Sequence, residues 1–149
     1  MKEFSFSVPQ EIIVGKGSLA RLSEAAEKLG GKHGFIISGP HLNKMGIVAS
    51  CSESLENAGI KVDAYTETEG NPSVETVEKA AAAFCKSGAD FIIALGGGSP
   101  MDVAKAVGVV ARYGGSITEY EGGGRVPGDI IPLIAIPTTA GTGSEVTAF

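Results

Sequence analysis

The sequence FIIALGGGSPMD occupies residues 91–102. Its apolar run, Phe91 to Leu95, is typical of a short strand that is buried on both faces of a parallel sheet. Three glycines and a serine follow, and Pro100 suits the first turn of a helix, where the N–H that proline lacks would have no partner. A buried strand that leads directly into a helix is the repeating unit of parallel α/β folds.

The same alternation extends in both directions along the chain. Ser18 and Ser73 are candidate N-caps, and Gly88 is a candidate helix end. From the hydrophobic periodicity we expect further strands at 35–37, 62–66 and 133–136, and helices at 18–29, 47–58, 74–85 and 101–112.

The N-terminus carries a different pattern. Residues 4–8 alternate between apolar residues and serine, which is typical of a strand with one buried face. The apolar run 12–14 follows a turn, so we expect an antiparallel strand pair here. Residues 1–149 are then expected to form one Rossmann-like α/β domain, a parallel sheet flanked by helices and preceded by this pair. Residues 145–149 begin another strand-like run.

Glycine is the most unusual part of the composition. The 149 residues include 22 glycines, whereas the average frequency of roughly 7% would supply about 10. Twelve of them fall between residues 96 and 143. Such clustering indicates backbone that approaches a ligand closely or adopts a positive φ angle.

The remaining composition argues against several classes of protein. The net charge is −5 and the 12 lysines and arginines are scattered, so no basic stripe suits a nucleic acid. We find neither an apolar run of membrane-spanning length nor a signal peptide, and we therefore expect a cytoplasmic protein with no membrane partner. Cys51 and Cys85 lie in apolar helical phase, and we expect two buried thiols.

The glycine-rich turn at 96–99 is the strongest candidate site. The N–H groups and the positive end of the following helix would lie at the carboxyl edge of the sheet, where open α/β folds bind ligands. An anion could approach this backbone closely, which favours a phosphate or pyrophosphate. The alternative is a turn needed only for tight packing. The turn is not a G-x-G-x-x-G motif, because Met101 stands at the third glycine, and it is not a P-loop.

Two further segments are candidates. Residues 136–145 read IPTTAGTGSE and follow a buried strand. Their hydroxyls and glycines suit a phosphate or a ribose, and a simple polar turn is the alternative. Asn71-Pro72-Ser73 is a weaker candidate, because this tripeptide is also an ordinary entry to a helix.

Residues for chemistry are scarce. Neither His33 nor His41 has a histidine or carboxylate four residues later, and the sequence contains no HExxH, CxxC or G-x-S-x-G motif. Asp90 and Asp102 lie near the starts of predicted elements, where capping is the expected role. We therefore assign no catalytic residue and no metal ligand to this chain.

Two long motifs resemble those of the iron-dependent (group III) alcohol dehydrogenases. They are GGGSPMDVAKA at 96–106 and PLIAIPTTAGTGSEVT at 132–147, and Asn71-Pro72 stands at the spacing that the family also shows. The resemblance implies the N-terminal, cofactor-binding domain of an NAD(P)-dependent oxidoreductase that transfers a hydride between an alcohol or aldehyde and nicotinamide. The family's second, all-helical domain, which holds Fe²⁺, is absent from this sequence. We therefore expect a truncated chain that binds cofactor but does not turn over alone.

The resemblance also implies roles for individual residues. The first motif would hold the pyrophosphate, the threonines of the second would contact the phosphate and the nicotinamide ribose, and Phe149 would lie beside the nicotinamide half. The cofactor-binding residues implied in this way are Gly39, Asn71, Gly97, Gly98, Ser99, Thr138, Thr139, Thr142 and Phe149.

Gly39 is an informative departure from the family. Many relatives have at this position an aspartate that binds the hydroxyls of the adenosine ribose. A carboxylate there would repel a 2′-phosphate, so its absence predicts that NADP(H) is accepted, alongside or in preference to NAD(H). The alternative is that Gly39 only shapes the turn before Pro40.

Other functions fit parts of the same pattern. Glycerol dehydrogenases and dehydroquinate synthases have a similar first domain and mostly use zinc, but the string from Thr138 to Glu145 is more similar to the iron enzymes. A stand-alone nucleotide-binding module without catalysis is a further alternative. The family is commonly dimeric, and the strand predicted at 4–8 is a plausible edge for pairing between two copies, so we expect a homodimer.

Overall fold

The computed structural model describes residues 10–146 and contains a parallel sheet at its centre. The four strands lie in the order β2-β1-β3-β4, and every neighbouring pair is parallel. This confirms the predicted α/β class. The strands are β1 (His33–Ile37), β2 (Lys61–Tyr65), β3 (Phe91–Gly96) and β4 (Leu133–Pro137).

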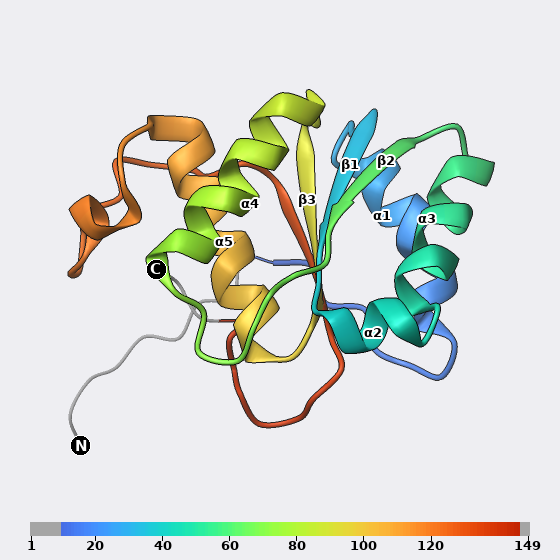
Figure 1. Cartoon of the computed structure of the whole chain (residues 1–149). Coiled ribbons are helices and arrows are strands. Elements are labelled where there is room, and N and C mark those ends of the chain that lie inside the picture. Colours follow the sequence, from blue (N-terminus) through green and yellow to red (C-terminus); the bar gives the residue numbers. More distant parts are fainter. Residues whose placement is uncertain (1–9, 147–149) are drawn as a thin grey trace, which may run out of the picture.

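Helices cover both faces of the sheet (Figure 1). The first face carries α1 (Leu22–Lys28), α2 (Pro40–Lys44) and α3 (Ile47–Asn57), and the other carries α4 (Val74–Ser87) and α5 (Gly98–Tyr113). Two 3₁₀ helices, η1 (Ser18–Arg21) and η2 (Ile117–Tyr120), complete the described elements.

Strand β3 shows why the core has two halves. All six of its residues are buried, and successive side chains of a strand point to opposite faces of the sheet. Ile92 and Ala94 accordingly pack in the cluster formed with α4 and α5, whereas Ile93 and Leu95 pack in the cluster formed with α1 and α3. The continuous apolar run is therefore the signature of a central strand covered on both sides.

Two of the three helix ends predicted from Ser18, Ser73 and Gly88 are confirmed, and both belong to α4. The Ser73 hydroxyl accepts a hydrogen bond from the Thr76 N–H at 3.2 Å, and Gly88 ends α4 with a φ angle of 76°. The prediction of Ser18 as an N-cap is wrong. Gly17 occupies that position with a φ angle of 78°, and the segment begins as η1 instead of an α-helix.

Two other expectations are wrong, and a third is untested. Residues 12–14 form no strand, and Ile12 and Val14 are exposed, because within residues 10–146 no neighbouring strand offers them backbone partners. Residues 4–8, the other half of the predicted pair, lie outside the described residues. Glu145 and Val146 form part of a turn, not a strand, and helix α2 was not expected at all.

The two cysteines differ in their surroundings. Cys51 is buried on α3, as predicted, and this burial raises the pKa of its thiol. Cys85 is exposed, because α4 turns its other side, with Val77 and Phe84, toward the sheet. Among the helices of residues 10–146, none has the length and apolar character needed to cross a membrane.

The packing of β1 against β3 leads to a stability prediction. A Cβ atom at Gly34 would lie 2.8 Å from Cζ of Phe91, whose side chain is 1% exposed and cannot move into solvent. Gly34→Ala should therefore lower the free energy of unfolding by about 1–3 kcal/mol through overpacking. Urea denaturation measures this change. The matched control is Gly123→Ala, where nothing lies within 4 Å of the added Cβ; equal midpoints for the two variants would contradict the prediction.

Candidate functional site

The carboxyl ends of the four strands meet at one edge of the sheet, at the bottom of Figure 1. A cavity of about 450 Å³ lies at this edge, which we call the carboxyl-edge cavity. Its lining comes from the segments that follow all four strands: Gly39–Leu42, Thr68–Gly70, Gly96–Pro100 and Thr138. Five of the nine residues that the sequence assigns to the cofactor are in this lining: Gly39, Gly97, Gly98, Ser99 and Thr138.

The turn between β3 and α5 forms one wall. Gly96 has a φ angle of 143°, and a Cβ there would lie 2.8 Å from Cγ of Pro100, so this position requires glycine. Gly97 is the N-cap and α5 begins at Gly98, three residues before the start predicted at Met101. The first N–H groups of a helix have no intrahelical partner, and those of Gly98 and Ser99 therefore lie at the positive end of the helix.

The second glycine-rich segment packs directly against the first. The Thr138 N–H donates a hydrogen bond to the Gly96 carbonyl oxygen at 2.8 Å. Oγ1 of Thr139 lies 3.1 Å from the place where a Cβ of Gly97 would stand, and Cβ of Thr142 lies 3.6 Å from the corresponding place at Gly98. The structure thus brings together the two motifs that the sequence singled out separately.

Asn71 and Phe149 are two further residues that the sequence assigns to the cofactor. Asn71 is next to Gly70, which lines the cavity, but is not itself in the lining. Its φ angle of 51° makes it the one residue other than glycine with a positive φ in the described part of the chain. Phe149 lies outside the described residues, so its predicted place beside the nicotinamide half stays a prediction.

A carboxylate that the sequence reasoning missed holds the segment around Asn71. Oε1 of Glu69 accepts hydrogen bonds from the Thr76 hydroxyl at 2.6 Å, from the Ser73 hydroxyl at 3.2 Å and from the Ser73 N–H at 3.3 Å. These bonds, that from Thr76 first, hold the pKa of Glu69 below its ordinary value of 4.5. Glu69 precedes the N-cap Ser73 by four residues. This spacing was the signal in the sequence that could have indicated a carboxylate bonded to the start of α4.

Gly39 lies where β1 passes into α2. It is the N-cap of α2, with an extended backbone, and a Cβ there would lie 3.2 Å from the Thr68 carbonyl oxygen. The preceding Ser38 is buried and donates from its hydroxyl to the Leu95 carbonyl oxygen at 2.8 Å. The end of β1 is thereby tied to the end of β3, and Gly39 is set close to the segment that follows β2.

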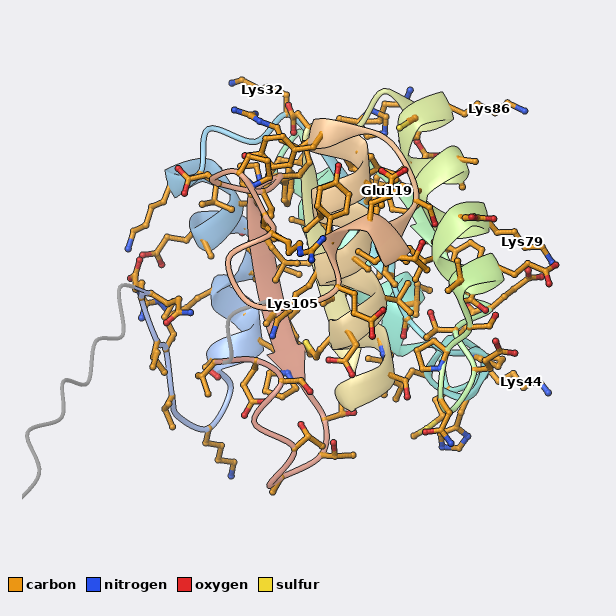
Figure 2. The ribbon with its side chains drawn as sticks, turned by 90° about the vertical axis from the view of Figure 1, so that its left-hand side faces the viewer. Lys32, Lys44, Lys79, Lys86, Lys105 and Glu119 are labelled. Atoms are coloured by element: carbon orange, nitrogen blue, oxygen red, sulfur yellow. The ribbon has the colours of Figure 1, made fainter. Side chains whose placement is uncertain are left out.

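Lys105 lies close enough to the threonine-rich segment to interact electrostatically with Glu145. Figure 2 shows it on α5 beside β4, whereas Lys79 and Lys86 project outward from α4. Burial lowers the pKa of Lys105, and the nearby carboxylates of Asp102 and Glu145 partly oppose this shift. A second cavity, of about 960 Å³, includes Lys105, Glu145 and residues of β4 in its lining.

The model of the family described as iron-containing alcohol dehydrogenase matches residues 9–149. This chain belongs to the iron-containing alcohol dehydrogenase family. The match covers both glycine-rich segments, and the resemblance drawn from the two motifs is thereby confirmed.

Curated relatives within this group act on different compounds according to their names. The chain is 40% identical over 151 residues to a choline dehydrogenase of Bacillus subtilis, and the match spans 99% of this chain and 38% of that protein. It is 31% identical to an NAD-dependent methanol dehydrogenase of Bacillus methanolicus, over 97% of this chain and 38% of that protein. The chain therefore spans well under half of the length of these relatives.

Solved structures of the same kind share the fold. A 1,3-propanediol oxidoreductase is 34% identical with a TM-score of 0.93, over 98% of this chain and 38% of that one. A sulfoacetaldehyde reductase from Bifidobacterium kashiwanohense, solved in complex with NAD⁺, is 34% identical with a TM-score of 0.89, over 99% of this chain and 39% of that one.

The family name implies iron, but the described residues of this chain do not fit an iron site. Between residues 10 and 146 no three His, Cys, Asp or Glu side chains are grouped as a metal would require. His41 lines the carboxyl-edge cavity. His33 is at the opposite, amino end of β1, where its Nε2 lies 2.7 Å from a carboxylate oxygen of Asp63.

The hydrogen bonds of Glu69 lead to a prediction about pH. Since its pKa is lowered in the folded chain, its ionised form stabilises the fold above pH 4.5, and this contribution is lost as the pH falls through the lowered pKa. Thr76→Val removes the shortest of the three bonds and should raise the pKa of Glu69 toward 4.5.

An NMR titration of the side-chain carboxyl groups measures the pKa of Glu69 in both proteins. The control is Thr118→Val, which removes a hydroxyl on the 3₁₀ helix η2 that donates to the hydroxyl of Ser116, the N-cap of η2. A pKa for Glu69 that is the same in Thr76→Val and in the native chain would contradict the assignment.

Proposed function

We propose that this chain binds a nicotinamide dinucleotide, NAD(H) or NADP(H), along the carboxyl edge of its sheet and forms the cofactor-binding part of an alcohol dehydrogenase. When bound, the dinucleotide carries the hydride that interconverts an alcohol and an aldehyde. The observation that supports this most strongly is the meeting of the two glycine-rich segments, joined by the hydrogen bond from Thr138 N–H to the Gly96 carbonyl.

The start of α5 is the proposed pyrophosphate site. Gly97, Gly98 and Ser99 place backbone N–H groups at the positive end of a 16-residue helix, which favours an anion there. The glycines keep this backbone accessible, because a Cβ at Gly98 would lie 3.4 Å from the Ser144 hydroxyl and fill the space between the two segments. We therefore expect a pyrophosphate to lie where the start of α5 faces the threonine-rich segment, and a methyl group at Gly98 to narrow that space.

The strand order sets the direction of the dinucleotide. The pyrophosphate at the end of β3 has Thr138, Thr139 and Thr142 on the β4 side and Gly39 on the β1 side. We place the nicotinamide ribose on the threonine side, and the adenosine half beside Gly39. Asn71 follows the segment after β2, and we assign it to the cofactor as well.

The remaining parts of the proposal concern the whole protein. We assign these residues to orienting the cofactor and not to acid–base chemistry, and we propose that iron is held by residues outside those described. The substrate is a small alcohol or aldehyde. The parent protein is proposed to be a cytoplasmic homodimer, in which residues 1–149 form one domain; the support is the family resemblance.

The proposed pyrophosphate site is tested by Gly98→Ala. The added Cβ makes ordinary contacts with Ser144 and Thr142, so the fold should be kept, and alanine favours the helix. Binding of NAD⁺ and NADP⁺, measured by isothermal titration calorimetry, should weaken about tenfold or more, because the methyl group occupies the anion's place.

Gly123→Ala is the matched control, in which nothing lies within 4 Å of the added Cβ, and it should bind like the native chain. Failure of the native chain to bind either dinucleotide, or equal affinity of Gly98→Ala and Gly123→Ala, would contradict the proposed function.

The absence of a side chain at Gly39 is tested by Gly39→Asp. The new carboxylate would stand on the adenosine side of the cavity and repel a 2′-phosphate, so the dissociation constant for NADP⁺ should rise about tenfold while that for NAD⁺ does not. Gly39→Asn is the control for size, since a Cβ at this position lies 3.2 Å from the Thr68 carbonyl oxygen.

The native chain should bind NADP⁺ at least as tightly as NAD⁺. Clearly tighter binding of NAD⁺ by the native chain would contradict the prediction that Gly39 admits the 2′-phosphate.

A further inference from the structure

Thr68 carries an unpaired hydroxyl in the lining of the carboxyl-edge cavity. The residue is 5% exposed, and its Oγ1 is the buried side-chain oxygen or nitrogen without a hydrogen-bond partner in the described part of the chain. Buried polar atoms are nearly always hydrogen-bonded, and an exception in a native structure points to a missing partner or a functional role. None of the sequence motifs includes this residue.

The backbone of Thr68 is held firmly beside Gly39. Its N–H donates to the Ser38 carbonyl oxygen at 3.2 Å, and its own carbonyl oxygen lies 3.2 Å from the place where a Cβ of Gly39 would stand. Thr68 is thus tied to the end of β1 while it belongs to the segment after β2. Because the backbone is held, the hydroxyl can change its surroundings only by rotation between the staggered positions about the Cα–Cβ bond.

The position along the sheet edge selects the part of a ligand that Thr68 can reach. The strand order is β2-β1-β3-β4, with the proposed pyrophosphate site after β3 and the threonine-rich segment after β4. Thr68 lies on the opposite side, with Gly39 and Glu69. A ligand that extends from the pyrophosphate site toward Thr68 therefore brings its other half, the adenosine half, to this hydroxyl.

We propose that Thr68 is a cofactor-binding residue whose hydroxyl pairs with an oxygen on the adenosine ribose of the dinucleotide. A threonine hydroxyl both donates and accepts, so it suits a ribose hydroxyl, and it can also donate to a phosphate at the same ribose carbon. The cofactor then supplies the partner that residues 10–146 do not provide. This inference rests on the proposed function, since it needs a dinucleotide in the cavity.

Two properties respond to this hydroxyl in opposite directions, and together they separate a binding role from a structural one. Thr68→Val keeps the shape of the side chain but removes the unpaired oxygen, so the melting temperature without ligand should rise. The same change should weaken binding of NAD⁺ and of ADP-ribose about 5- to 20-fold, because a hydrogen bond to the ribose is lost. Nicotinamide mononucleotide has no adenosine ribose, and its binding should not change.

The other partner of the proposed hydrogen bond, the ribose hydroxyl, can be removed from the ligand. The native chain should bind the 2′,3′-dideoxyadenosine analogue of NAD⁺ more weakly than NAD⁺, whereas Thr68→Val should show a smaller difference between the two. Thr68→Ser restores the hydroxyl and should recover affinity. Thr118→Val, on η2, is the control that should leave melting temperature and affinity for all probes near those of the native chain. Comparison of NAD⁺ with NADP⁺ shows whether Thr68 reaches a hydroxyl or a 2′-phosphate.

The outcomes are distinct. A higher melting temperature of Thr68→Val with unchanged affinity for NAD⁺, NADP⁺ and ADP-ribose overturns the inference and leaves the proposed function intact. Equal loss of affinity for nicotinamide mononucleotide also overturns it, because the effect is then not confined to the adenosine half. If Thr68→Val does not fold, equal affinity of the native chain for NAD⁺ and its dideoxy analogue overturns it. If the native chain binds no dinucleotide, the proposed function fails, and the inference with it.

Discussion

The site depends on how β3 ends. This strand is hydrogen-bonded to β1 and β4 and is covered by helices on both faces, so its last residues have a single position. Gly96 then turns the chain with a φ angle that suits glycine, and α5 begins two residues later at Gly98. The segments after β1 and β4 are hydrogen-bonded to this end of β3. The Ser38 hydroxyl donates to the Leu95 carbonyl oxygen, and the Thr138 N–H donates to the Gly96 carbonyl oxygen.

The segment after β2, on the opposite side of the carboxyl-edge cavity, contains one polar side chain that is hydrogen-bonded within the protein and one that finds no partner within residues 10–146. Glu69 places its carboxylate at the start of α4, where it accepts from the N-cap Ser73 and from Thr76 and is favoured by the positive end of the helix. Its neighbour Thr68 has a buried hydroxyl that finds no such partner within residues 10–146. The Glu69 carboxylate is thus hydrogen-bonded within the protein, while the hydroxyl of the preceding Thr68 keeps its hydrogen-bonding capacity for a ligand.

Local signals in the sequence predicted those features that depend on neighbours along the chain. The apolar run at 91–95 forms a central strand because its side chains are apolar on both faces of the sheet. Ser73 caps α4 because its hydroxyl accepts from the N–H three residues ahead. Predictions failed where the local structure or the burial of a residue depends on contacts with residues far away in the sequence. Residues 12–14 need a neighbouring strand to become one, and the side of α4 that carries Cys85 is exposed because the sheet packs against the other.

The sequence by itself determined the alternation of strands and helices and the two glycine-rich motifs that identify the family. It also predicted, through the family resemblance, the residues that we propose for the cofactor. It could not show that Thr139 lies against Gly97, that Glu69 holds the start of α4, or that the Thr68 hydroxyl finds no partner among the described residues. Those facts join residues that are many positions apart, and only the parallel sheet, by gathering the carboxyl ends of its strands at one edge, decides which of them meet.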